Sequence, residues 1–234
     1  MARDSLGIWC DENLNPIFAK IFDALKADDV DPLFRYIAIS FSKNSIAMFE
    51  SLKGHLRSYP VAQAMRLLME FEADTDFLVK NPKNIPRMKK KTDKLRAEYV
   101  DDKKSWSKSI IDSGNMHLLD DVTKEDTTTK GRVEKVFDKD TYAFYCAYSH
   151  FNLYAICDDA ENVSSFDNAY VKKTNYQKAE LIKFYPVILD KFVKSLNNLL
   201  TDDNKIEYNP AKLVDAFKIL LVAICKAKIR SQDV

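Results

Sequence analysis

Apolar residues recur at three- and four-residue spacing through most of this chain, and that periodicity restricts its fold more than any other feature. Prolines stand where the periodic stretches begin, which suits the first turn of a helix because proline lacks the N–H that this turn leaves unbonded. Strand-length alternation bounded by hairpin turns does not appear. We therefore predict an all-α fold: one domain over residues 1–234, a single bundle of about seven or eight helices, with a polar connection around 114–132.

Several helices can be placed from these signals. Helix starts are predicted at Pro32, Pro60, Pro86 and Pro210, and Pro186 is expected to kink a long helix over 181–199. The stretches that begin at Pro60 and at Thr141 are apolar nearly all round, so we predict that both helices lie at the centre. The helix after Pro32 is predicted to face inward with Leu33, Tyr36, Ile37, Ser40, Ala47, Met48 and Leu52. The helix after Pro210 is predicted to face inward with Leu213, Phe217, Leu220 and Ile224.

Charge and composition remove several classes of function. With 36 Lys and Arg against 35 Asp and Glu, the formal charge is +1, and no global field draws the chain to nucleic acid or to a membrane. Acidic residues interrupt the first segment where a secretory signal needs an unbroken apolar run, so we expect no membrane association and a cytoplasmic location. The four glycines are widely separated, which excludes P-loop and Rossmann sites, and no cofactor is expected.

Metal binding is not expected either. The four cysteines lack the close pairs that zinc and redox sites need, and we predict that they are reduced, buried thiols. Glu70, Asp74 and His150 would converge if the two apolar helices packed side by side, but the Glu-x-x-His spacing of di-metal bundles does not occur. A metal site is therefore a minor alternative.

Arg66 and Glu70 lie one turn apart on the apolar helix after Pro60, and Asp74 follows another turn along the same side. Charges in such surroundings need partners, so the favoured interpretation is a structural ion pair that orients the helix. The alternative is that Arg66 binds an anion or a substrate, with Glu70 handling a proton and Asp74 contributing to binding.

The other apolar helix gathers reactive side chains, and His150 is its main candidate for catalysis. Cys146 precedes His150 by one turn, and Cys146 and Tyr148 are candidate binding residues. A hydrogen-bonded core histidine beside a core cysteine is the favoured interpretation, because residues four apart on one helix rarely align for nucleophilic attack. The candidate catalytic set is therefore Arg66, Glu70 and His150.

A basic stretch between Lys80 and Lys104, with Tyr99 and Trp106 interleaved, has the composition of a nucleic-acid-binding surface. Acidic residues dilute its charge, and both aromatic residues fall on the predicted inward stripe. A solvated helix face is favoured, with nucleic-acid binding as the less favoured alternative.

With these residues in view, the chain resembles a family of uncharacterised bacterial helical proteins over about Phe41 to Cys157. In that family an Arg-x-x-x-Glu helix precedes a Tyr-x-x-x-Ser/Cys-x-x-x-His helix. The matching residues are Arg66 and Glu70, then Tyr142, Cys146 and His150. This resemblance implies a helical fold and carries no established activity.

More distantly, the chain resembles HEPN proteins, helical bundles that include many toxin and defence ribonucleases. Their active site has Arg followed by four to six residues and then His. His55, His117 and His150 have no arginine at these distances, so that motif is absent from any single helix. Arg66 and His150 lie on two different predicted helices, and these would have to bring them together.

Two functions follow as expectations. The first is a helical binding or interaction protein in bacterial stress or phage defence, forming a homodimer or holding a protein partner. An exposed apolar patch would favour this function, whereas an isolated monomer with a deep polar cleft would count against it. The second is a hydrolase or nuclease that acts on a phosphate-containing substrate through Arg66, Glu70 and His150.

Overall fold

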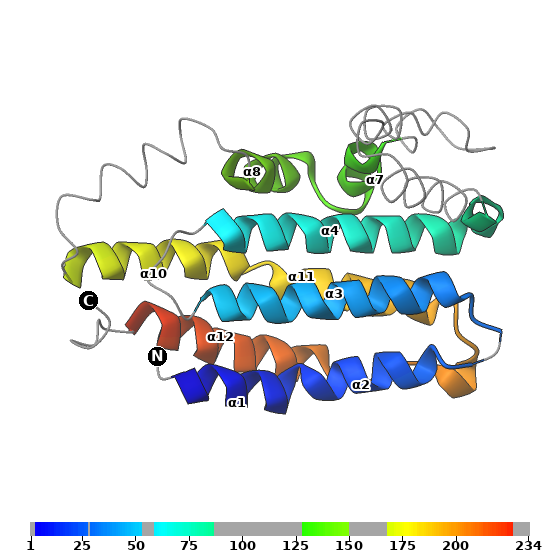
Figure 1. The fold of residues 1–234 in the computed structure, drawn as a ribbon, viewed down its shortest axis with the longest axis horizontal. Coiled ribbons are helices and arrows are strands. Elements are labelled where there is room, and N and C mark those ends of the chain that lie inside the picture. The colour runs from blue at the N-terminus through cyan, green and yellow to red at the C-terminus, as the bar shows by residue number, and fades with distance from the viewer. Residues whose placement is uncertain (1–2, 28, 53–58, 87–127, 150–167, 227–234) are drawn as a thin grey trace, which may run out of the picture.

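The computed structural model describes residues 3–27, 29–52, 59–86, 128–149 and 168–226. Within these ranges the regular elements are helices and no strand occurs, so the predicted all-α class is confirmed (Figure 1). The α-helices are α1 (Arg3–Asn13), α2 (Asn15–Ala24), α3 (Pro32–Ser51), α4 (Tyr59–Lys80), α7 (Thr129–Val136), α8 (Lys139–Ser149), α10 (Asn168–Ile182), α11 (Tyr185–Asn197) and α12 (Pro210–Lys226), with short 3-10 helices η1 (Pro82–Asn84) and η3 (Asp202–Asn204).

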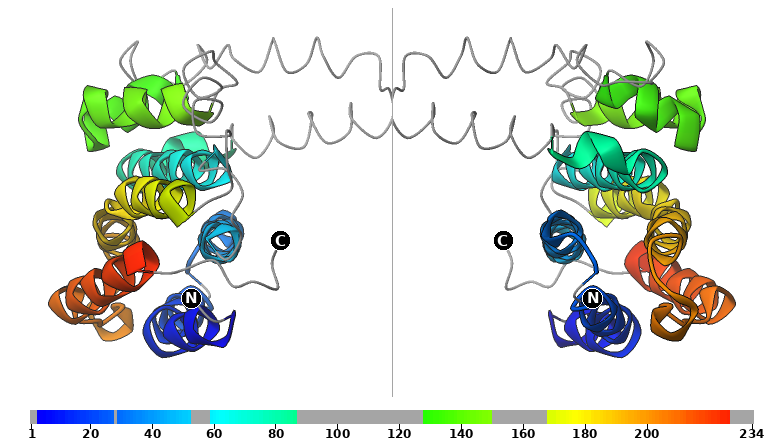
Figure 2. Two further views of the ribbon diagram at one scale, coloured as in Figure 1. Left: turned by 90° about the vertical axis from the view of Figure 1, so that its left-hand side faces the viewer. Right: turned by 90° about the vertical axis from the view of Figure 1, so that its right-hand side faces the viewer.

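Helix α4 occupies the middle of the bundle, as its sequence predicts. It packs against α7 and α8 on one side and against α3, α10 and α11 on the other. The end-on views in Figure 2 show α7 and α8 as an outer layer above α4, with α12 and α1 farthest from that layer. The side chains of Val61, Met65 and Leu68 are fully buried, so α4 brings its apolar face to the core.

The predicted helix starts are confirmed where the structure describes them. Helix α3 begins at Pro32, and the carboxylate of Asp31 accepts a hydrogen bond from the Leu33 N–H at 2.9 Å. In the same way Asn209 accepts from the N–H of Lys212 at 3.0 Å at the start of α12. Each cap satisfies a backbone donor of the first turn, which is why these sequences begin helices where they do.

Pro186 ends one helix and begins another instead of kinking a single long one. Helix α10 ends at Ile182 and α11 begins at Tyr185, with Pro186 in its first turn. The proline cannot donate to the carbonyl of Ile182, and its ring would collide with that carbonyl in a continuous helix. The predicted kink is therefore a break.

The inward face of α12 is confirmed, because Leu213, Phe217, Leu220 and Ile224 are all buried. The predicted face of α3 is partly wrong. Tyr36 is 68% exposed, and the buried side chains are Phe34, Ala38, Phe41, Ser42, Ser45, Met48 and Phe49. Two apolar stripes run beside each other on α3, and contact with α4 and α11 selects the one that carries the phenylalanines.

Helix α8 is also not central. Its Tyr142 and Tyr145 are buried against the bundle, but Phe144 is 42% exposed, and α8 covers the outer side of α4. Its apolar composition reflects a helix with one buried face and small or aromatic residues on the other.

Aromatic side chains fix α11 against the rest of the bundle. Phe192 stacks on Phe41 of α3 with ring centroids 4.0 Å apart and planes within 4° of parallel. On the other side of the core, Trp9 lies between the rings of Phe49 and Phe217, and its Nε1 donates to the carbonyl of Ala216 at 3.1 Å. These contacts join α11 to α3, and α1 to α3 and α12.

Some expectations fall outside the described residues: the helix after Pro86, residues 114–127 of the connection and the segment after Ser149. The last residues of the predicted connection belong to α7, which begins at Thr129 behind a Thr128 cap. None of the described helices has the length and apolar character needed to cross a membrane.

Candidate functional site

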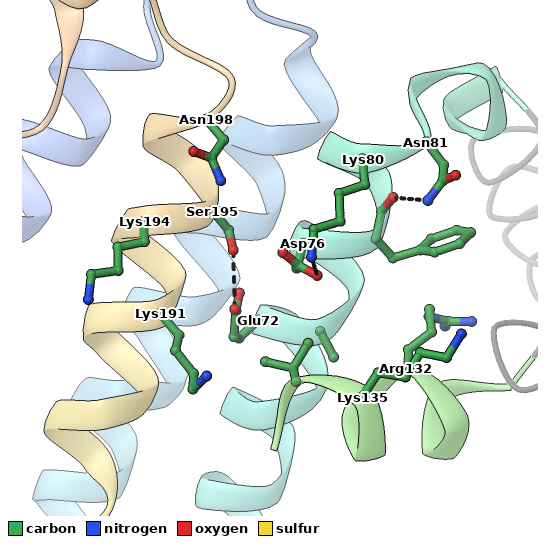
Figure 3. Close-up of a pocket in the computed structure, with 13 residues that line it drawn as sticks. Glu72, Asp76, Lys80, Asn81, Arg132, Lys135, Lys191, Lys194, Ser195 and Asn198 are labelled. Atoms are coloured by element: carbon green, nitrogen blue, oxygen red, sulfur yellow. Dashed lines mark hydrogen bonds and ion pairs between the residues drawn. The ribbon is translucent and has the colours of Figure 1, made fainter. Parts of the chain in front are cut away.

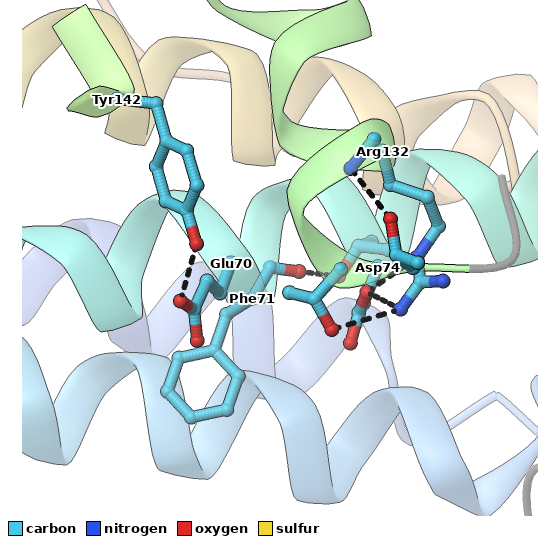
Figure 4. Close-up of polar contacts among 9 residues, drawn as sticks. Glu70, Phe71, Asp74, Arg132 and Tyr142 are labelled. Atoms are coloured by element: carbon cyan, nitrogen blue, oxygen red, sulfur yellow. Dashed lines mark hydrogen bonds and ion pairs between the residues drawn. The ribbon is translucent and has the colours of Figure 1, made fainter. Parts of the chain in front are cut away.

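The predicted pair of Arg66 and Glu70 is present on α4 and is joined by a residue of α8. Arg66 Nε donates to Glu70 Oε1 at 2.8 Å. The Tyr142 hydroxyl donates to the same oxygen, also at 2.8 Å (Figure 4). Glu70 is therefore shared between a cation on its own helix and a phenol from the layer above.

Electrostatics favour this arrangement. Burial, together with the hydrogen bond and the charge of Glu70, raises the pKa of Tyr142 well above its ordinary value, so the phenol stays a neutral donor. Burial alone would lower the pKa of Arg66, but the charge and the hydrogen bond of Glu70 outweigh it and raise that pKa. The side chains of Arg66 and Glu70 are 27% and 19% exposed, which places the pair at the edge of the core.

Asp74, one turn further along α4, pairs with Arg132 of α7. The contacts from Arg132 Nε and Nη2 to Asp74 Oδ1 are 2.8 and 2.7 Å (Figure 4). Arg132 is only 3% exposed, and its guanidinium lies 5.4 Å from the centre of the Phe77 ring. Arg66 and Glu70 therefore pair with each other, and Glu70 also bonds to Tyr142 of α8. Asp74 pairs instead with Arg132 and anchors α7.

The other predicted site residues are described only in part. Cys146 lies half-buried on α8, within electrostatic reach of Tyr142. The side chain of Tyr148 and all of His150 lie outside the described residues. Cys10, Cys146 and Cys225 form no disulfide with one another, and all three are half-buried rather than buried. No cluster of three or more His, Cys, Asp or Glu side chains suited to a metal ion occurs within the described ranges.

A polar cavity lies on the neighbouring side of α4, where α4, α7 and α11 meet (Figure 3). Its volume is about 460 Å³, within the range of about 300–1,000 Å³ that is typical of ligand sites. We call it the Glu72 cavity after the acid in its wall. Its wall is formed by Glu72, Ala73, Asp76, Phe77 and Lys80 of α4, Arg132, Lys135 and Val136 of α7, Lys191, Lys194 and Ser195 of α11, and the adjoining Asn81 and Asn198.

Glu72 is the most unusual group in the cavity wall. Its side chain is 1% exposed, and the Ser195 hydroxyl donates to its Oε1 at 3.1 Å (Figure 3). The second oxygen, Oε2, is buried and has no hydrogen-bond partner among the described residues. Burial, followed by the nearby charge of Asp76, raises the pKa of Glu72 to about 8, although Ser195, Lys191 and Lys80 act in the opposite direction. Near neutral pH the group is therefore mostly an uncharged carboxylic acid.

Protonation fixes the direction of the hydrogen bonds at Glu72. Because Ser195 donates to Oε1, the acid proton resides on Oε2, the oxygen without an acceptor. The last torsion of a glutamate side chain is broad, so the carboxyl group can turn to bring Oε2 to the cavity, at the expense of the hydrogen bond between Ser195 and Oε1. Glu72 can then donate one hydrogen bond to an acceptor atom inside the cavity.

Cations dominate the rest of the wall. Lys80 pairs with Asp76 at 2.7 Å and Lys194 with Asp190 at 2.6 Å. Lys191 lies in no ion pair within the described part of the chain, and its Nζ is 5.5 Å from the centre of the Phe137 ring. Among the described residues, the cationic side chains of the wall are Lys80, Arg132, Lys135, Lys191 and Lys194, and its carboxyl groups are Glu72 and Asp76.

Sequence reasoning found Arg66, Glu70 and Asp74 and missed the cavity. A signal for Glu72 was present, because it continues the buried stripe of Val61, Met65 and Leu68 by one more turn. An acid in the middle of such a stripe must be neutral or paired. No comparable signal marks Lys191, Ser195 or Arg132, which approach Glu72 only through the packing of separate helices.

Comparison with known proteins finds no family model, no curated relative and no solved structure that matches this chain.

Proposed function

We propose that this chain is a helical binding protein that holds a small molecule in the Glu72 cavity through an anionic tetrahedral group such as phosphate. The observation that carries the proposal is Glu72, a buried neutral acid in the wall of a cavity of about 460 Å³, with one oxygen that lacks a partner among the described residues. Such groups carry a free-energy cost in a folded protein, and a bound acceptor would offset it.

The charge of the wall supports an anion as the ligand. Five cationic side chains line the wall. Lys80, Lys194 and Arg132 are paired with Asp76, Asp190 and Asp74, whereas Lys191 lies in no ion pair among the described residues, and Glu72 is mostly uncharged near neutral pH. Lysine and arginine residues of α4, α7 and α11 line one space, which suits an acceptor with several oxygens on different sides. A hydrogen bond from the acid of Glu72 to an anionic oxygen would be charge-assisted, and would add to these contacts.

A hydrolase or nuclease acting through Arg66, Glu70 and His150 is less well supported. The charge of Arg66 is already matched by Glu70 at 2.8 Å, and Glu70 also accepts from Tyr142. Binding a phosphate at Arg66 would require that pair to separate. A polar cavity also favours a small ligand over protein association. A homodimer and a role in bacterial stress or phage defence stay predictions.

The proposal is tested by following the unfolding temperature of the full chain against inorganic phosphate at about pH 6.5. Ligands that bind only the native state raise this temperature with concentration. We expect a saturable rise for the wild type that is lost in Lys191→Ala. The matched control is Lys212→Ala, an exposed lysine of α12 outside the cavity wall, which should behave as the wild type. Equal responses in all three proteins would overturn the proposal.

The role of Glu72 has its own test with sulfate, whose charge does not change between about pH 6 and pH 9. Binding to the wild type should weaken as the pH rises past about 8, because an ionised Glu72 repels the anion. In Glu72→Gln the side chain is a neutral donor at every pH, so sulfate binding should persist. The same pH profile for both proteins would exclude Glu72 from the site.

A further inference from the structure

A second, apolar hollow adjoins the Glu72 cavity. It lies between α4, α11 and the junction of α7 with α8, and its volume is about 150 Å³. We call it the Phe137 hollow. Most of its wall is apolar, and Asp138, Thr141 and Lys191 complete it. The apolar lining residues are Met69, Val136, Phe137, Phe184, Val187 and Ile188.

The two spaces are neighbours that share part of their lining. Val136 and Lys191 line both of them. Along α11, Val187 and Ile188 face the hollow, Lys191 stands at the boundary, and Ser195 faces the cavity. A molecule bound at Glu72 therefore meets an apolar compartment next to its anionic group.

From this juxtaposition we infer that the ligand carries, beside its anionic group, one aromatic or heteroaromatic ring that occupies the Phe137 hollow. This inference rests on the proposed function of the Glu72 cavity. A phosphate group alone is much smaller than the cavity, and the Phe137 hollow lies on the side of the cavity where Lys191 stands.

Size and chemistry both select a single ring. An apolar cavity of about 150 Å³ in another protein accommodates benzene, which sets the scale for the hollow. The Lys191 ammonium already lies over the Phe137 ring, so a second ring placed in the hollow would meet a cation that favours aromatic faces. Phe184 and Val187 are 36% and 46% exposed at the hollow, and a bound ring would cover part of this apolar surface.

The experiment compares three probes by isothermal titration of the full chain at about pH 6.5: inorganic phosphate, methyl phosphate and phenyl phosphate. In the wild type we expect phenyl phosphate to bind about tenfold more tightly than methyl phosphate, since its ring leaves water for an apolar wall. Both esters should require Lys191 in the same way as phosphate does.

A double variant, Phe184→Ala with Val187→Ala, separates the hollow from the cavity. Both residues are partly exposed, so the fold should tolerate the change, which circular dichroism would verify. We expect phenyl phosphate to lose most of its advantage while methyl phosphate binds as before. The matched control is Val214→Ala with Ile219→Ala on α12, two exposed apolar residues outside both spaces, which should leave all affinities unchanged.

The outcomes distinguish this inference from the proposed function. If methyl and phenyl phosphate bind equally well and both depend on Lys191, the ring is excluded and the anion site stands. If the double variant weakens all three probes equally, the hollow supports the fold and does not hold a ring. If no probe binds the wild type, both proposals fail.

Discussion

Replacing Glu72 with glutamine should remove most of the pH dependence of folding stability that this one buried acid creates. Its pKa is raised from 4.5 to about 8 in the folded protein, chiefly by burial. The native state therefore holds the proton more tightly than the unfolded chain does. The contribution of Glu72 to the free energy of unfolding is then highest below about pH 4.5 and falls as the pH rises to about 8.

The size of the effect follows from the shift. Each pKa unit corresponds to about 1.4 kcal/mol, so the whole shift amounts to roughly 5 kcal/mol across that window. Between about pH 5.5 and pH 7.5 the loss is roughly 2.5 kcal/mol, a large fraction of the 5–15 kcal/mol that stabilises typical domains. Glutamine has no proton to lose here, so Glu72→Gln should lack this loss.

The assay is urea denaturation at steps of pH, followed by circular dichroism in wild type and variant. Other groups titrate in both proteins, so the difference between the two curves isolates Glu72. The pH series stops at about pH 8 because Lys178, whose pKa burial lowers to about 8, adds stability as the pH rises further toward 10.5. Equal pH slopes for the two proteins would refute the claim that Glu72 is neutral when folded, and with it the donor role assigned to this acid.

Three further changes test the packing around the site by urea denaturation. Tyr142→Phe removes the hydrogen bond to Glu70 and should cost about 1.5 kcal/mol, whereas a loss below about 0.5 kcal/mol would mean that water replaces the phenol. Asp74→Asn takes the carboxylate from the buried Arg132 and should cost about 2–3 kcal/mol; an unchanged midpoint would contradict the anchoring of α7. Phe192→Ala opens the core between α3 and α11 and should cost about 3–5 kcal/mol, while a cost under about 1 kcal/mol would exclude the stacked contact.

Much of the fold could be predicted because helix signals are local. The helix start at Pro32 and the stripe of α12 depend only on neighbouring residues, and both are found as predicted. Local signals do not identify the buried face of a helix that carries two apolar stripes. On α3 the stripes that carry Tyr36 and Phe34 have the same spacing, and only packing against other helices selects between them.

In the candidate site, too, contacts within one helix were predictable and contacts between helices were not. The pair of Arg66 and Glu70 was predictable, since residues one turn apart on a helix are neighbours. The partners of Asp74 and Glu72 were not, because Arg132 and Ser195 lie 58 and 123 residues away in sequence. Such contacts depend on how α7 and α11 dock on α4, and helix periodicity does not specify that docking.

The central claim is that the Glu72 cavity is a ligand site, and a crystal structure of the full chain grown with phenyl phosphate at about pH 6.5 tests it most directly. We expect density for the phosphate within hydrogen-bond distance of Glu72 Oε2 and Lys191 Nζ, with the ring beside Phe137. An empty cavity with the phosphate bound instead at Arg66, after separation from Glu70, would contradict it and favour the hydrolase or nuclease alternative.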